Sequence, residues 1–92
     1  MRVELTKRFL ATVRALPESD VAAVDAALSN LPAIFGRPHQ HAGASVRAIR
    51  PPVYEMRASL ALRIVFVRSG DVLKVDFVGN HDDVRRYLRS LR

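Results

Sequence analysis

The chain has 92 residues, of which 49% are hydrophobic and 26% are charged, and its formal net charge is +6. This length predicts a single domain over residues 1–92. Cysteine is absent, which excludes disulfides and thiolate metal sites. No apolar run approaches the ~20 residues that a bilayer span requires, and the opening residues MRVELTKRF contain no apolar signal region. We therefore expect a cytoplasmic protein without a membrane partner.

The positive charge comes almost entirely from arginine, because Lys7 and Lys74 are the only lysines among the 15 basic residues. Arginine presents a planar fork of donors that matches two phosphate oxygens and also stacks on bases. The excess therefore favours a polyanionic partner such as RNA. An arginine-rich codon usage with ordinary surface charge is the alternative interpretation.

The first third of the chain predicts a short strand followed by two helices. Residues 3–5 form the strand, and Thr6 is placed to cap a helix that runs to Leu16 and ends before Pro17. Ser19 is placed to cap a second helix, which Pro32 ends or kinks. The tight corner between them predicts an antiparallel helix hairpin. The apolar stripes are Phe9, Leu10, Val13 and Leu16 in the first helix, and Val21, Val24, Leu28 and Leu31 in the second.

Four strands are predicted next, at residues 45–50, 53–59, 61–68 and 72–78, with a hairpin turn at 69–71. Apolar residues alternate along the last two strands, which predicts one sheet face packed on the helices. That face carries Leu62, Ile64, Phe66, Leu73, Val75 and Phe77. The opposite face carries Glu55, Arg57, Arg63, Lys74 and Asp76. Asn80 is placed to cap a final helix with the stripe Val84, Leu88 and Leu91, and Asn80 with Asp83 resembles a capping box.

We therefore predict an α+β fold. An N-terminal helix hairpin packs on a twisted, mainly antiparallel four-stranded sheet, and a C-terminal helix follows.

Three segments carry a resemblance to a known family: LTKRFLATVRALP, HAGASVRAIRPPVYEMRASLALRIVF and VDFVGNHDDVRRYL. In this order they resemble the RelE/ParE superfamily, the toxins of type II toxin–antitoxin modules. The RelE-like branch, which we favour, implies cleavage of mRNA in the ribosomal A site. The ParE-like branch implies inhibition of DNA gyrase without nuclease activity, and a catalytically inactive binding module is a third alternative.

The resemblance implies that the catalytic residues are Arg57, Arg63, His81 and Tyr87. Some family members carry several lysines on the middle strands, and this chain has none there. Arg47 and Arg50 are the candidates to replace them, and the identity of the general base stays open.

The implied reaction is attack of an RNA 2′-hydroxyl on the neighbouring phosphate, which needs proton transfer and cations but no metal or other cofactor. His81, at the start of the last helix, is a residue type that exchanges protons near neutral pH. It could instead serve only to cap or pack the helix. Arg57 and Arg63 would bind the phosphate, or alternatively pair with Glu55 and Asp76. Tyr87 would stack on a base, or belong to the core.

Further basic side chains are predicted to contact RNA: Arg47, Arg50, His39, His41, Lys74 and Arg85. The last-helix arginines could equally be solvated, or bind acidic antitoxin residues. The spacing of His39 and His41 suggests metal weakly, and we predict no metal site. The expected partners are a cognate antitoxin, mRNA and ribosomal RNA.

Overall fold

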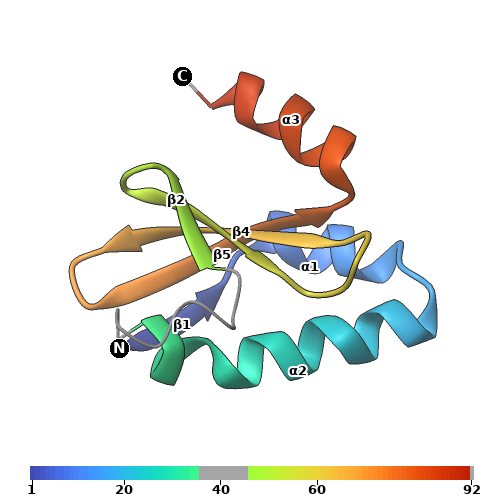
Figure 1. The fold of residues 1–92 in the computed structure, drawn as a ribbon, viewed down its shortest axis with the longest axis horizontal. Helices are drawn as coiled ribbons and strands as arrows, with labels where there is room; N and C mark the ends of the chain where they lie inside the picture. Colours follow the sequence, from blue (N-terminus) through green and yellow to red (C-terminus); the bar gives the residue numbers. More distant parts are fainter. Residues whose placement is uncertain (36–45, 92) are drawn as a thin grey trace.

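The computed structural model describes residues 1–35 and 46–91 of the chain (Figure 1). A strand and two helices come first, followed by four strands and a last helix. The elements are β1 (Arg2–Leu5), α1 (Lys7–Arg14), α2 (Glu18–Phe35), β2 (Val46–Arg50), β3 (Val53–Arg57), β4 (Arg63–Ser69), β5 (Val72–Gly79) and α3 (His81–Ser90).

The two N-terminal helices form as predicted but with shifted ends. Thr6 caps α1, and its hydroxyl accepts a hydrogen bond of 3.2 Å from the Phe9 N–H. Helix α1 ends at Arg14, two residues before the predicted end, and α2 already begins at Glu18, so Ser19 does not precede it as a cap.

Helix α2 also continues through Pro32 to Phe35 instead of ending there. Leu31 is fully buried and Ile34 and Phe35 pack against the core, so burial of the last turn outweighs the backbone hydrogen bond that proline removes.

The helix hairpin is confirmed only in part. The corner at Pro17 joins the helices, but α1 lies mainly against β5 rather than along α2. Figure 1 shows α2 running back beneath the sheet.

The sheet has five strands in the order β1-β5-β4-β3-β2, one more than predicted. Strand β1 pairs with β5 in parallel, and the other neighbours are antiparallel, so the sheet is mixed. The Arg2 N–H donates to the Asp71 carbonyl at 2.9 Å and the Thr6 N–H donates to the Val75 carbonyl at 3.0 Å, which ties both ends of β1 to β5. The hairpin turn between β4 and β5 contains Gly70 at φ +63°, where glycine avoids the strain of an L side chain.

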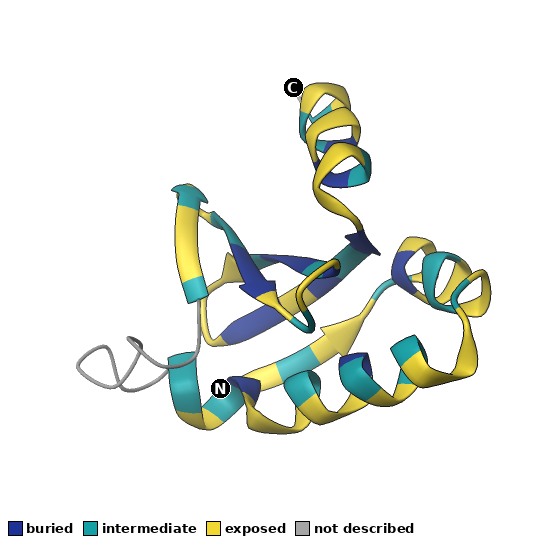
Figure 2. Cartoon of the chain, turned by 45° about the vertical axis from the view of Figure 1, so that its right-hand side comes forward, coloured by how far each residue is buried: buried dark blue, intermediate teal, exposed yellow. Residues whose placement is uncertain are grey.

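The main core lies between one sheet face and helices α1 and α2 (Figure 2). Its buried members are Phe9, Val24, Leu31, Met56, Leu62, Ile64, Phe66, Leu73, Val75 and Val78. None of the helices within the described residues combines the length and apolar character needed to cross a bilayer.

A β-bulge in β5 changes the predicted assignment of the sheet faces. Phe66 pairs with Val75 and Val65 pairs with Phe77, so Asp76 is the extra residue between them. Phe77 therefore lies on the sheet face opposite to that of Val75, contrary to the predicted alternation.

On the opposite face, Phe77 packs in a second, smaller core beneath α3. This core is built around the buried residues Val65, Val84 and Tyr87. The predicted polar face is therefore covered by α3 over part of its area and is charged mainly where the helix leaves it open.

Candidate functional site

Three of the four predicted catalytic residues lie where three strands meet at one end of the sheet. Arg57, the last residue of β3, is the register partner of Arg63, the first residue of β4. Arg63 is also the partner of Gly79, the last residue of β5. Since α3 begins two residues after Gly79, His81 joins the two arginines at this end.

The start of α3 is fixed by a capping box. The Asn80 side chain accepts the Asp83 N–H at 2.8 Å, and the Asp83 carboxylate accepts the Asn80 N–H at 3.1 Å. Gly79 allows the close approach, because a Cβ there would lie 2.6 Å from the Asp83 Cβ. Asn80 is therefore the cap, and His81 lies exposed on the first turn.

The arginines differ in their partners. The Arg63 Nη1 lies 3.8 Å from the Glu55 carboxylate, whereas the Arg47 Nε donates to the same oxygen at 2.8 Å. The Arg57 side chain is exposed and makes no hydrogen bond or ion pair among residues 1–35 and 46–91. Of the two arginines at the end of the sheet, Arg63 therefore pairs with Glu55, whereas the Arg57 side chain is available for a ligand.

Asp76 belongs to a different cluster and pairs with neither arginine on the sheet. Its carboxylate accepts the Thr6 hydroxyl at 2.7 Å and the Tyr87 hydroxyl, and it lies 3.7 Å from the Arg8 guanidinium. Asp76 is the extra residue of the bulge and lies between the start of α1 and Tyr87 of α3, so these elements cover it and it is not on an open part of the sheet.

Tyr87 joins α3 to this cluster. Its ring is buried and stacks on Phe77 with centroids 4.6 Å apart. Burial, followed by the hydrogen bond and the charge of Asp76, raises the pKa of Tyr87 well above its usual range. The Tyr87 hydroxyl therefore stays protonated and donates to Asp76. The buried, stacked ring fits a role in the core better than stacking on an RNA base. A catalytic role for Tyr87 stays a prediction.

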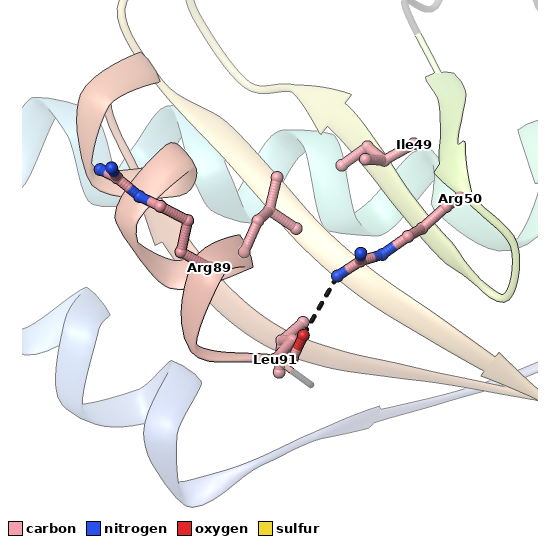
Figure 3. A pocket seen from close by; sticks show the side chains of 5 residues that line it. Ile49, Arg50, Arg89 and Leu91 are labelled. Atoms are coloured by element: carbon pink, nitrogen blue, oxygen red, sulfur yellow. Dashed lines mark hydrogen bonds between the residues drawn. The ribbon is translucent and has the colours of Figure 1, made fainter.

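A groove of about 490 Å³ separates the C-terminal half of α3 from β2 (Figure 3). It is lined by Ile49, Arg50, Leu88, Arg89 and Leu91. The Arg50 Nη2 donates to the Leu91 carbonyl at 3.1 Å and so links β2 to the end of the helix. Arg85 and His81 precede Arg89 by four and eight residues, so all three follow one face of α3. This row leads from the groove to the end of the sheet where Arg57 and Arg63 lie.

The remaining RNA-binding candidates are dispersed. Arg47 and Arg85 are exposed on either side of the groove. Lys74 pairs with Val67 and Glu4 and lies five positions before Gly79 in β5, which places it roughly 16 Å along the strand from the arginine pair at 3.3 Å per residue. His39 and His41 lie outside the described residues. Within the part of the chain that the structure describes, no group of three or more His, Cys, Asp or Glu residues could hold a metal ion.

Glu55 is the residue whose importance the sequence did not reveal. It was expected only as a possible partner for an arginine, yet it is the single charged side chain that is buried among the described residues. Its position two residues before Arg57 on the same strand face was the available signal, but burial depends on the packing of neighbouring strands.

The solved structures most informative for this chain are bacterial and archaeal toxins and their complexes. YafQ from E. coli BL21(DE3) superposes with a TM-score of 0.71 at 11% identity, over 91% of this chain and 98% of YafQ. The RelB–RelE antitoxin–toxin complex from Methanococcus jannaschii matches with a TM-score of 0.68 at 13% identity, over 91% of this chain and 96% of the matched chain. The archaeal RelE–RelB complex from Pyrococcus horikoshii OT3 matches with a TM-score of 0.63 at 15% identity, over 86% of this chain and 92% of the matched chain.

No protein-family model matches the sequence, and no curated protein matches it significantly. At these identities the likeness concerns the three-dimensional architecture. The chain therefore has a RelE-like fold, which it shares with YafQ and with the archaeal RelE proteins.

Proposed function

We propose that this protein is the toxin of a type II toxin–antitoxin module and acts as an endoribonuclease that cleaves mRNA at the ribosome. The observation that carries this proposal is the pairing of Arg57 with Arg63 at the end of the sheet, next to the exposed His81. Cations beside a proton-exchanging side chain are what metal-independent RNA cleavage requires.

The chemistry follows from these groups. The 2′-oxygen attacks the adjacent phosphorus, the bond from phosphorus to the 5′-oxygen breaks, and the products carry a 2′,3′-cyclic phosphate and a 5′-hydroxyl. His81 exchanges the proton at one of the two oxygens. Arg57 and Arg63 bind the non-bridging oxygens, whose negative charge increases in the transition state. The row of Arg85 and Arg89 along α3 provides a path for the RNA backbone toward the groove.

A cell experiment tests this function. Induced expression should arrest growth, with protein synthesis falling before DNA synthesis, and primer extension should reveal new 5′ ends within translated mRNA. The double variant Arg57→Ala/Arg63→Ala should abolish both effects. The matched control Arg2→Ala/Arg14→Ala removes the same charge from exposed positions in β1 and α1 and should stay toxic. Supercoiling defects and DNA damage that precede any loss of translation would support gyrase inhibition instead.

A cognate antitoxin is part of the same proposal, since the matching structures include a RelB–RelE antitoxin–toxin complex and a RelBE2 toxin–antitoxin complex. We expect an acidic segment to cover the arginines and the groove between α3 and β2. The two proteins should co-purify, and high salt should weaken the complex. A complex that leaves Arg57, Arg63 and His81 exposed would contradict inhibition by occlusion of the site.

A further inference from the structure

Glu55 is a buried carboxylate that lies between arginines of the two neighbouring strands. Its residue is 4% exposed, and it lies in the middle of β3, between β2 and β4. Arg47 is its register partner on β2, and Arg63 reaches it from β4. Both guanidinium groups contact the same carboxylate oxygen, at 2.8 Å and 3.8 Å.

This arrangement addresses two electrostatic problems. A buried carboxylate is costly unless cations and hydrogen bonds compensate for the lost water. Arg57 and Arg63 stand directly opposite each other, and like charges opposite each other in a sheet are destabilising. Glu55 is compensated by Arg63 and Arg47, and in return it draws the Arg63 guanidinium away from Arg57.

The exposed fractions of the Arg63 and Arg57 side chains fit these different roles. The Arg63 side chain is only 24% exposed and is held from the sheet side, whereas Arg57 is exposed and without a partner among the described residues. One guanidinium is thus fixed in place, and its register partner is free to reach a ligand.

We propose that Glu55 is the positioning residue of the site: it holds Arg63, and with it Arg47, in the orientation that binds the scissile phosphate beside Arg57. This inference rests on the proposed function for the identity of the ligand. Glu55 acts through the arginines and does not itself exchange a proton with RNA, because its carboxylate is shielded and faces the two guanidinium groups.

The first test compares the steady-state kinetics of RNA cleavage by the wild type, Glu55→Gln and Glu55→Asp. Misplacing a group by about 1 Å costs roughly 10²-fold in rate, so Glu55→Gln should lose about that factor in kcat with a smaller change in KM. Glu55→Asp keeps the charge on a shorter arm and should recover part of the rate. The matched control is Glu4→Gln, which removes an exposed ion pair with Arg2 at the far edge of the sheet and should leave the rate unchanged.

The second test separates positioning from proton transfer. If Glu55 acts through its partners, adding Glu55→Gln to Arg47→Ala/Arg63→Ala should cause little further loss. The pH–rate profile of Glu55→Gln should also keep its shape at a lower amplitude. Losses that multiply in the triple variant, together with a missing limb of the profile, would overturn the proposal. Thermal melts of each variant establish that it is folded.

The third test does not depend on RNA. Guanidinium NMR signals of labelled protein should show Arg47 and Arg63 ordered in the wild type and mobile in Glu55→Gln, with Arg57 mobile in both. Unchanged Arg47 and Arg63 signals in Glu55→Gln would refute the positioning role whether or not the protein cleaves RNA. A wild type that cleaves no RNA would refute the proposed function, while these signals would still decide the role of Glu55.

Discussion

His81 is exposed on the first turn of α3, and its side chain makes no hydrogen bond or ion pair within residues 1–35 and 46–91. The neighbouring Asn80 and Asp83 cap the helix, so the histidine is not needed for that purpose. Its location beside Arg57 and Arg63 therefore leaves it available for the proposed reaction.

The first prediction is that His81→Ala removes RNA cleavage and toxicity but leaves the protein folded. Loss of a general acid or base typically costs ~10²–10⁴-fold in rate, whereas an exposed substitution usually changes stability by no more than about 0.5 kcal/mol. Cleavage assays and thermal melts measure the two effects. Asp82→Ala, at the adjacent exposed position, is the control and should stay active. A fully toxic His81→Ala protein that cuts mRNA at the same sites would exclude His81 from the mechanism.

The sequence predicted the arginine pair and His81 because strand alternation and the cap at Asn80 define their positions locally. The sequence could not decide whether Tyr87 belongs to the site or to the core. That choice depends on the bulge in β5, where Asp76 accepts the Tyr87 hydroxyl. The burial of Glu55 was equally out of reach, because it is produced by side chains from two neighbouring strands.

At the scale of elements, α3 is the part of the site that is held by the smallest interface. Its apolar contacts belong to the small core around Val65, Val84 and Tyr87, and hydrogen bonds from Tyr87 to Asp76 and from Arg50 to the Leu91 carbonyl complete the attachment. Because α3 carries His81 and one wall of the groove, its docking determines the geometry of the site.

The second prediction concerns the Tyr87 hydroxyl. Tyr87→Phe should lower stability by about 1 kcal/mol, while Asp76 keeps its hydrogen bond from Thr6. The pKa of Tyr87 is raised in the folded protein, so its contribution is complete below the unfolded value of about 10 and is lost as pH rises above it. The difference in unfolding free energy between wild type and variant should therefore be constant at neutral pH and shrink above about pH 10. A difference that grows with alkaline pH would contradict the assigned hydrogen bond.

The third prediction concerns the junction between β5 and α3. Gly79→Ala places a methyl group 2.6 Å from the Asp83 Cβ, so the start of α3 must shift. We expect a loss of about 1–3 kcal/mol from overpacking together with reduced cleavage, measured by melts and rate assays. Gly70→Ala is the control: its positive φ costs about 1–2 kcal/mol, but the turn lies at the opposite end of β5, so activity should persist. Equal activity of the two variants would show that the junction does not position His81.

The order of helices and strands could be predicted from periodicity and capping, and the last helix with its capping box is confirmed. The parallel pairing of β1 with β5 could not, because nothing local in a four-residue strand specifies a partner seventy residues away. The continuation of α2 through Pro32 likewise depends on the core that receives Leu31, Ile34 and Phe35.

At the scale of the whole molecule, a net charge of +6 would attract RNA even without a site. RNA could be attracted by the net charge of the whole molecule or by a local group of cations. The arginines are unevenly placed, which allows the two cases to be compared. Arg85 and Arg89 follow one face of α3, and Arg57 lies at the end of the sheet where this helix begins, while Arg2 lies on β1 at the edge of the sheet.

The fourth prediction uses salt dependence to separate these two cases. For single-stranded nucleic acid, each phosphate that a protein neutralises contributes roughly 0.7 to the slope of log affinity against log salt concentration. Binding of a non-cleavable 2′-deoxy oligonucleotide, followed by fluorescence anisotropy, should show that Arg57→Ala lowers the slope by about that amount. Arg2→Ala removes the same unit of charge and should leave the slope unchanged. If both variants weaken binding equally, the attraction belongs to the net charge of the molecule, and the end of the sheet is not a phosphate site.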